Sequence, residues 1–164
     1  MWWYSGEIDL GFSGALRMAA TIVTDDPIFG LFAYGGELKW SKDSVAVIPK
    51  DGLRARFAVV RNNVRFQMEL DRDGFARHQA IHFSDSLGQI SFVLENRSHD
   101  AHETNIQLRG LPAGTYRVLL NHVEIAMLSV RAGERHEVKL PLAINGGAVT
   151  IVRNEQFVSA KYSG

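Results

Sequence analysis

The chain has 164 residues, which is enough for one domain and too few for two of ordinary size. Hydrophobic residues make up 46% and charged residues 22%, a balance typical of a globular protein rather than a disordered one. Basic and acidic residues are equal in number, at 18 each. This balance argues against a nucleic-acid-binding or membrane-surface protein, because such proteins usually carry an excess of positive charge. The absence of cysteine excludes disulfides, thiolate zinc sites and cysteine nucleophiles.

The chain opens on three aromatic residues, Trp2, Trp3 and Tyr4, with no basic stretch before them, so no signal peptide is visible. The longest apolar run, residues 28–34, is far shorter than the roughly 20 residues that cross a bilayer. Because chain termini are usually polar, we expect this start to be an internal cut in a longer protein.

The first predicted element is a helix over Ser13–Thr24. Its first residue can act as the N-cap, apolar side chains recur at spacings of three and four, and Asp25-Asp26-Pro27 ends it. The following run, residues 28–34, is apolar on both sides. Since one helix and one such run cannot bury their own surfaces, we expect residues 1–36 to be a helical or irregular segment, the tail of a missing helical domain.

From residue 37 onward the hydrophobic pattern has a period of two, which predicts about ten short strands. The strands recur about every 8 to 12 residues, and no long amphipathic helix interrupts them, so a parallel βαβ sheet is not expected. We therefore predict a mainly β fold, with an antiparallel β-sandwich over residues 37–164. The predicted turns lie at residues 61–63, 71–74, 112–114, 121–122, 132–134 and 145–147.

Three stretches carry a resemblance to a known family: residues 2–7 (WWYSGE), residues 26–36 (DPIFGLFAYGG) and residues 110–142, which open with GLPAGTYRV. Together they resemble the C-terminal part of a large bacterial family that is catalogued as a domain of unknown function. The resemblance implies a secreted or periplasmic parent protein of glycoside-hydrolase type. In such a parent, an (α/α) toroid is followed by β-sandwich modules.

The aromatic opening is the candidate sugar-binding site, because sugar rings stack on aromatic planes and carboxylates accept hydrogen bonds from the hydroxyl groups around them. Trp2, Trp3 and Tyr4 are the candidate ligand-binding residues. Glu7 and Asp9 are candidate catalytic carboxylates, each able to supply one member of a glycosidase pair if a missing toroid supplies the other. The alternative is that the aromatic residues belong to a hydrophobic core.

No metal site is expected from the histidines. In a strand, His78 and His82 lie about 13 Å apart, too far to share one ion. His99 and His102 fall in a predicted turn, where surface histidines are commoner than zinc ligands. Residues 71–74 (DRDG) resemble the start of a calcium loop but lack its third acidic position, so we favour a hairpin turn, with a structural calcium as the alternative.

Our first functional hypothesis is a non-catalytic C-terminal β-sandwich module that packs on the helical toroid of a polysaccharide-processing protein. One alternative is a free-standing carbohydrate-binding module whose stacking residues are Trp2, Trp3, Trp40 or Tyr116. Another is a fragment that lends Glu7 or Asp9 to a shared glycosidase site. The expected partners are the toroid, an oligo- or polysaccharide, or a second copy of the chain, since open sheet edges and an uncovered apolar segment favour self-association.

Overall fold

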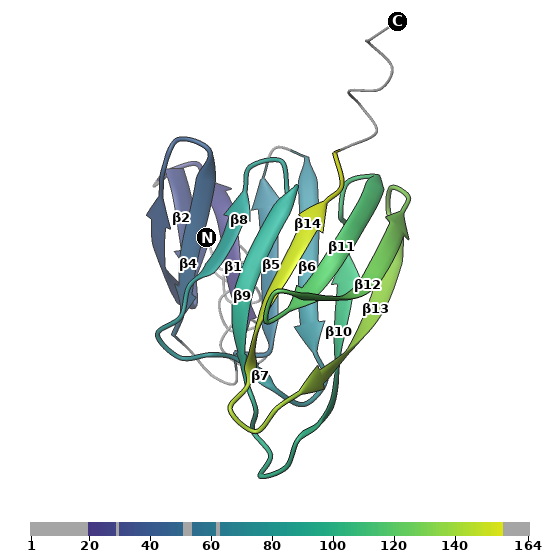
Figure 1. The fold of residues 1–164 in the computed structure, drawn as a ribbon. Coiled ribbons are helices and arrows are strands. Elements are labelled where there is room, and N and C mark those ends of the chain that lie inside the picture. Colours follow the sequence, from purple (N-terminus) through teal and green to yellow (C-terminus); the bar gives the residue numbers. More distant parts are fainter. Residues whose placement is uncertain (1–19, 29, 51–53, 62, 156–164) are drawn as a thin grey trace, which may run out of the picture.

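A computed structural model describes residues 20–28, 30–50, 54–61 and 63–155. These residues form fourteen strands and no helix, arranged as two facing sheets (Figure 1). The predicted mainly β sandwich is therefore confirmed, although its strands number fourteen rather than about ten. The described part of the chain holds no helix with the length and hydropathy needed to cross a membrane.

Each sheet combines strands from distant parts of the sequence. The six-stranded sheet contains, in spatial order, β13 (Arg135–Leu142), β10 (His102–Arg109), β6 (Val64–Leu70), β5 (Arg56–Arg61), β1 (Ala20–Asp26) and β2 (Gly30–Tyr34). The eight-stranded sheet contains β12 (Val123–Val130), β11 (Gly114–Leu120), β14 (Gly147–Arg153), β9 (Gln89–Glu95), β8 (Ile81–Ser84), β4 (Ser44–Pro49) and β3 (Gly36–Trp40), with β7 (Gly74–Phe75) paired to β9 off this path.

The helix predicted over Ser13–Thr24 is wrong where the structure describes it, because residues 20–24 belong to β1. The sequence Thr-Ile-Val-Thr at 21–24 consists of β-branched residues, which favour a strand. In this strand Val23 is fully buried in the core. Residues 13–19 of the predicted helix lie outside the described residues.

We predicted that the sandwich begins at residue 37, but the strands within residues 20–36 also belong to it. β1 pairs with β2 antiparallel and with β5 in parallel, so the sheet is also not purely antiparallel. Gly35, with φ of 70°, joins β2 to β3 and carries the chain from one sheet to the other. Residues 1–19 of the predicted N-terminal segment lie outside the described residues.

The core lies between the two sheets and is filled by alternate residues of each strand. In β6, Phe66, Met68 and Leu70 are buried, while the alternate residues 65, 67 and 69 face solvent, as the period-two pattern predicts. Phe57 packs edge-to-face on Phe83 and Phe75, with ring centroids 5.8 and 6.4 Å apart, so aromatic contacts join the two sheets.

The connecting turns gather at the two ends of the sandwich (Figure 1). The upper end in this view includes the turns at residues 84–89 and 109–114. The lower end includes the turns at residues 70–74, 95–102 and 142–147.

Candidate functional site

The outer face of the six-stranded sheet carries an apolar surface over β1, β2 and β5. The strand register aligns its side chains in two rows, Tyr34–Ile22–Ala58 and Phe32–Thr24–Val60, which we call the β1–β2–β5 patch. The next residues along these strands, Val23, Ala33 and Val59, are buried in the core. Since successive side chains of a strand point to opposite faces, the patch points away from the core.

The patch is aromatic at its edge and partly open to solvent. The Phe32 and Tyr34 rings lie edge-to-face with centroids 5.0 Å apart. Phe32 is 36% exposed and Val60 38% exposed, and Ile28, in the turn that follows β1, is 83% exposed. A sheet with a solvated outer face usually carries polar side chains there, so this apolar area is a candidate contact surface.

The same rows become polar on the neighbouring strands. Ala58 is aligned with Gln67 and Val60 with Arg65, both on β6, and Gln67 is aligned with Arg109 on β10. The outer face of the six-stranded sheet therefore changes from apolar at β1, β2 and β5 to polar and charged at β6 and β10. This arrangement, an apolar area beside a polar rim, is typical of protein–protein interfaces.

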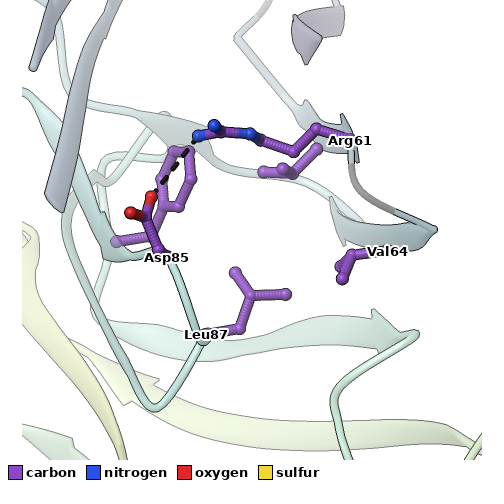
Figure 2. Close-up of a pocket in the computed structure, with 6 residues that line it drawn as sticks. Arg61, Val64, Asp85 and Leu87 are labelled. Atoms are coloured by element: carbon purple, nitrogen blue, oxygen red, sulfur yellow. Dashed lines mark hydrogen bonds and ion pairs between the residues drawn. The ribbon is translucent and has the colours of Figure 1, made fainter. Parts of the chain in front are cut away.

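The upper end of the sandwich contains a small pocket between the sheets (Figure 2). Figure 2 shows Arg61 directed toward Asp85, with Nη1 3.4 Å from Oδ1. The pocket volume is about 30 Å³, room for a few water molecules at most. Pockets for small-molecule ligands occupy roughly 300–1,000 Å³, so this space is a gap in the packing rather than a sugar site. The lining residues are Val59, Arg61, Val64, Phe83, Asp85 and Leu87.

A network of charged side chains closes the lower end. Arg54, only 6% exposed, donates from Nε to the Phe75 carbonyl at 2.9 Å and forms an ion pair with Glu95. Glu95 also accepts from Nε of Arg97 at 3.2 Å. Burial opposes the ionisation of Glu95, but the hydrogen bond from Arg97 and the charge of Arg54 outweigh it and hold its pKa below the ordinary 4.5.

Asp73, 1% exposed, is the second carboxylate of this network and is more deeply buried than Glu95. Its Oδ1 accepts from the Arg97 backbone N–H at 3.1 Å, and its Oδ2 lies 2.7 Å from Nε2 of His102. Burial alone would raise the pKa of Asp73. Hydrogen bonds, of which the one from His102 is the strongest, outweigh burial and hold this pKa below 3.8. Asp73 and Glu95 are thus both ionised, whereas a general acid in a glycosidase needs a raised pKa.

The calcium alternative at residues 71–74 does not fit the contacts that these carboxylates make. Asp71 accepts from Oγ1 of Thr104 at 3.2 Å and from both the backbone N–H and Nδ2 of Asn105 at 3.1 Å. Together with the contacts of Asp73, these donors occupy the oxygens that a cation needs. Within the described residues, no group of three or more Cys, His, Asp or Glu side chains could hold a metal ion.

The structure describes only some of the residues that the sequence predicted as binding or catalytic. Trp2, Trp3, Tyr4, Glu7 and Asp9 lie outside the described residues. Tyr116 is wrong as a stacking residue, because its ring is fully buried and its hydroxyl donates to the Pro112 carbonyl at 2.8 Å, a tyrosine corner. Trp40 is 66% exposed on the edge strand β3. The His102 ring contacts the Asp73 carboxylate and is not paired with His99.

Sequence reasoning missed both the patch and the lower network. The patch was missed because residues 20–24 were assigned to a helix, although their run of β-branched residues was an available signal. The contact between Asp73 and His102 spans 29 positions, and no local pattern indicates it.

Comparison with known proteins gives a family and no function. A family of unknown function (DUF5695) matches residues 2–145 of the chain. No curated protein and no solved structure matches the chain. The matched region ends before β14, the strand between β11 and β9, so the folded unit extends beyond the matched residues.

Proposed function

The chain belongs to the DUF5695 family of unknown function, and we propose that it is a non-catalytic β-sandwich module that packs on a helical domain through the β1–β2–β5 patch. The observation that carries this proposal is the pair of rows, apolar except for Thr24, on the outer face of three adjacent strands. A helix with an apolar stripe is the element that ordinarily covers such a sheet face.

The path of the chain favours a neighbour from the same polypeptide. β1 is the middle strand of the patch and the first described element. A helical domain that precedes this strand in the same polypeptide would therefore be tethered to the patch. Such tethering raises the effective concentration of an attached segment, so a modest apolar contact is enough for stable packing.

The chemistry of the lower network favours a structural module over an enzyme. Its two carboxylates, buried Asp73 and partly exposed Glu95, are committed to hydrogen bonds and to arginine or histidine partners. The pKa of each is lowered, which suits a permanent charge and not a proton donor. The link to polysaccharide processing rests on the resemblance of residues 2–7, 26–36 and 110–142.

The test is binding between this chain and the helical portion of its parent protein, produced separately and measured by calorimetry. Val60→Asp places a charge in the patch and should weaken binding at least about tenfold, since taking a carboxylate out of water costs free energy that an ion pair with Arg65, aligned with it on β6, repays only in part. Gln67→Glu is the matched control. It lies on the polar strand β6, aligned with Ala58 of β5, and should leave the affinity unchanged. Equal affinity for both variants, or a parent gene without a helical domain, would overturn the proposal.

A carbohydrate-binding module is the second candidate, and the exposure of Trp40 favours it. An indole ring that is 66% exposed on an edge strand can stack on a sugar ring. Titration with a panel of oligosaccharides should then give binding that Trp40→Ala abolishes. No binding by the unmodified chain removes this candidate.

The shared glycosidase site is the remaining alternative, with Glu7 or Asp9 as the carboxylate that this chain contributes. Glu7→Gln and Asp9→Asn in the full-length parent protein should each abolish turnover if that residue is catalytic. Unchanged turnover in both variants excludes the role.

A further inference from the structure

One buried carboxylate holds both ends of the loop between β9 and β10. This segment, residues 96–101, is named here the end loop. Oδ1 of Asp73 accepts from the Arg97 backbone at the start of the loop, and Oδ2 contacts His102 directly after its end. Asp73 is 1% exposed, so the two contacts form away from water. Asp73 therefore ties both ends of the end loop to the segment between β6 and β7.

Both ring nitrogens of His102 face atoms that accept hydrogen bonds. Nε2 lies 2.7 Å from the Asp73 carboxylate, and Nδ1 lies 3.0 Å from the Asp100 carbonyl oxygen. A neutral imidazole carries one N–H group and an imidazolium carries two. Only the protonated ring can donate to both acceptors, so this geometry favours the charged form of His102.

The second contact of His102 stabilises the interior of the end loop. The Asp100 carbonyl that accepts from His102 also accepts from Nδ2 of Asn96 at 2.9 Å. Nδ2 of Asn96 also donates to the Ala143 carbonyl, and Oδ1 of Asn96 accepts from the Ser98 backbone N–H. Loss of the His102 contact would weaken a set of bonds that joins the end loop to the turn between β13 and β14.

The charges around His102 favour its protonated form. The hydrogen bonds to the Asp100 carbonyl and to Asp73 raise its pKa above 6.5, and they outweigh burial and the positive charge of Arg72. From the sheet side, the residue aligned with His102 on β13 is Leu142, which carries no charge.

We propose that His102 is a proton-operated latch, which holds the end loop closed while its ring is charged and releases it when the ring loses its proton. On deprotonation the ring keeps one N–H group, so either the Asp73 contact or the Asp100 contact is lost. Because the pKa of His102 is higher when the loop is closed, the latch contributes fully below pH 6.5 and weakens as the pH rises through the raised value. The latch also needs ionised Asp73, so its lower limit is the depressed pKa of that group.

Nuclear magnetic resonance of the full chain tests the latch. The ring signals of His102 should titrate above pH 6.5, and amide-exchange protection at Arg97 and Ser98, corrected for intrinsic rates, should fall with the same midpoint. The fall should approach about tenfold for each pH unit by which the midpoint exceeds 6.5. A midpoint at or below 6.5, or protection that does not change between pH 5.5 and 8.5, would overturn the proposal.

Three variants separate the latch from a general effect of pH. His102→Gln should have low, pH-independent protection in the end loop, whereas His99→Gln, an exposed position in the same loop, should behave like the unmodified chain. Asp73→Asn should lower the midpoint of His102. Equal pH dependence in His102→Gln and the unmodified chain overturns the proposal, and if the His102 variant does not fold, the titration of the unmodified chain decides.

Discussion

Arg54 and Glu95, 41 positions apart in the sequence, form an ion pair at the lower end of the sandwich. The Arg54 side chain is 7% exposed and that of Glu95 31% exposed. Arg54 lies two positions before β5 and Glu95 is the last residue of β9, so the pair links the two sheets.

Glu95→Gln should destabilise the protein because it leaves the buried Arg54 charge without its anionic partner. Breaking a fully buried pair costs about 3–5 kcal/mol, and we expect about 2 kcal/mol here because Glu95 is partly exposed. Glu69→Gln is the matched control, since it breaks the exposed pair with Arg56 and should cost less than about 1 kcal/mol. Denaturant unfolding measures both values, and equal losses would contradict the prediction.

Gly146 should be intolerant of a side chain, because it combines a positive φ with close backbone contact. Its φ is 85°, and a Cβ atom added there would lie 2.0 Å from the Leu94 carbonyl oxygen. Gly146→Ala should therefore cost more than about 3 kcal/mol, the sum of backbone strain and steric overlap.

Gly133 provides the control for backbone strain alone. Its φ is 79°, but nothing lies within 4 Å of an added Cβ. Gly133→Ala should cost about 1–2 kcal/mol, so thermal or denaturant unfolding of the two variants isolates the steric part. A smaller loss for Gly146→Ala than for Gly133→Ala is the result that contradicts this assignment.

The folded unit should require β14, although the family match ends at residue 145. β14 lies between β11 and β9, and its side chains Val149 and Ile151 are each 1% exposed. Deletion of residues 146–164 should abolish cooperative unfolding, because two sheet neighbours lose their hydrogen-bond partner and the core loses a strand. Deletion of residues 156–164 is the control and should preserve the transition; circular dichroism distinguishes the two outcomes.

Acid should destabilise the protein through Asp73 and Glu95. Since the pKa of each is lower in the folded chain, their contribution is complete above the ordinary values of 3.8 and 4.5 and is lost as the pH falls through the lowered ones. The melting temperature should therefore fall steeply below about pH 4.5.

The double variant Asp73→Asn, Glu95→Gln should have a lower melting temperature at pH 6 and a flatter decline in acid. Glu103→Gln, from the exposed pair with Lys139, should keep the slope of the unmodified chain. An unchanged acid slope in the double variant would show that other groups govern the decline.

The predicted strands between residues 44 and 153 follow from alternation, because one face of each strand packs on the core and the other meets solvent. The same rule failed for β1. Its apolar residues also fit a helical spacing, and the parallel partner β5 that makes it a strand begins 36 positions later, at Arg56. The hairpin turn predicted at residues 71–74 is wrong, because β6 and β7 do not pair: residues 71–73 connect the six-stranded sheet to the eight-stranded one, and Gly74 begins β7.

The amino-acid sequence by itself determined the fold class and most turns, because the periodicity of side chains and the conformational preferences of glycine, proline and asparagine act over a few residues. The tertiary structure decided which strands pair, which outer face is apolar and which buried charges meet. These features depend on contacts between distant positions, such as Asp73 with His102 and Ile22 with Ala58. Their energies arise only when the two sheets exclude water from the space between them.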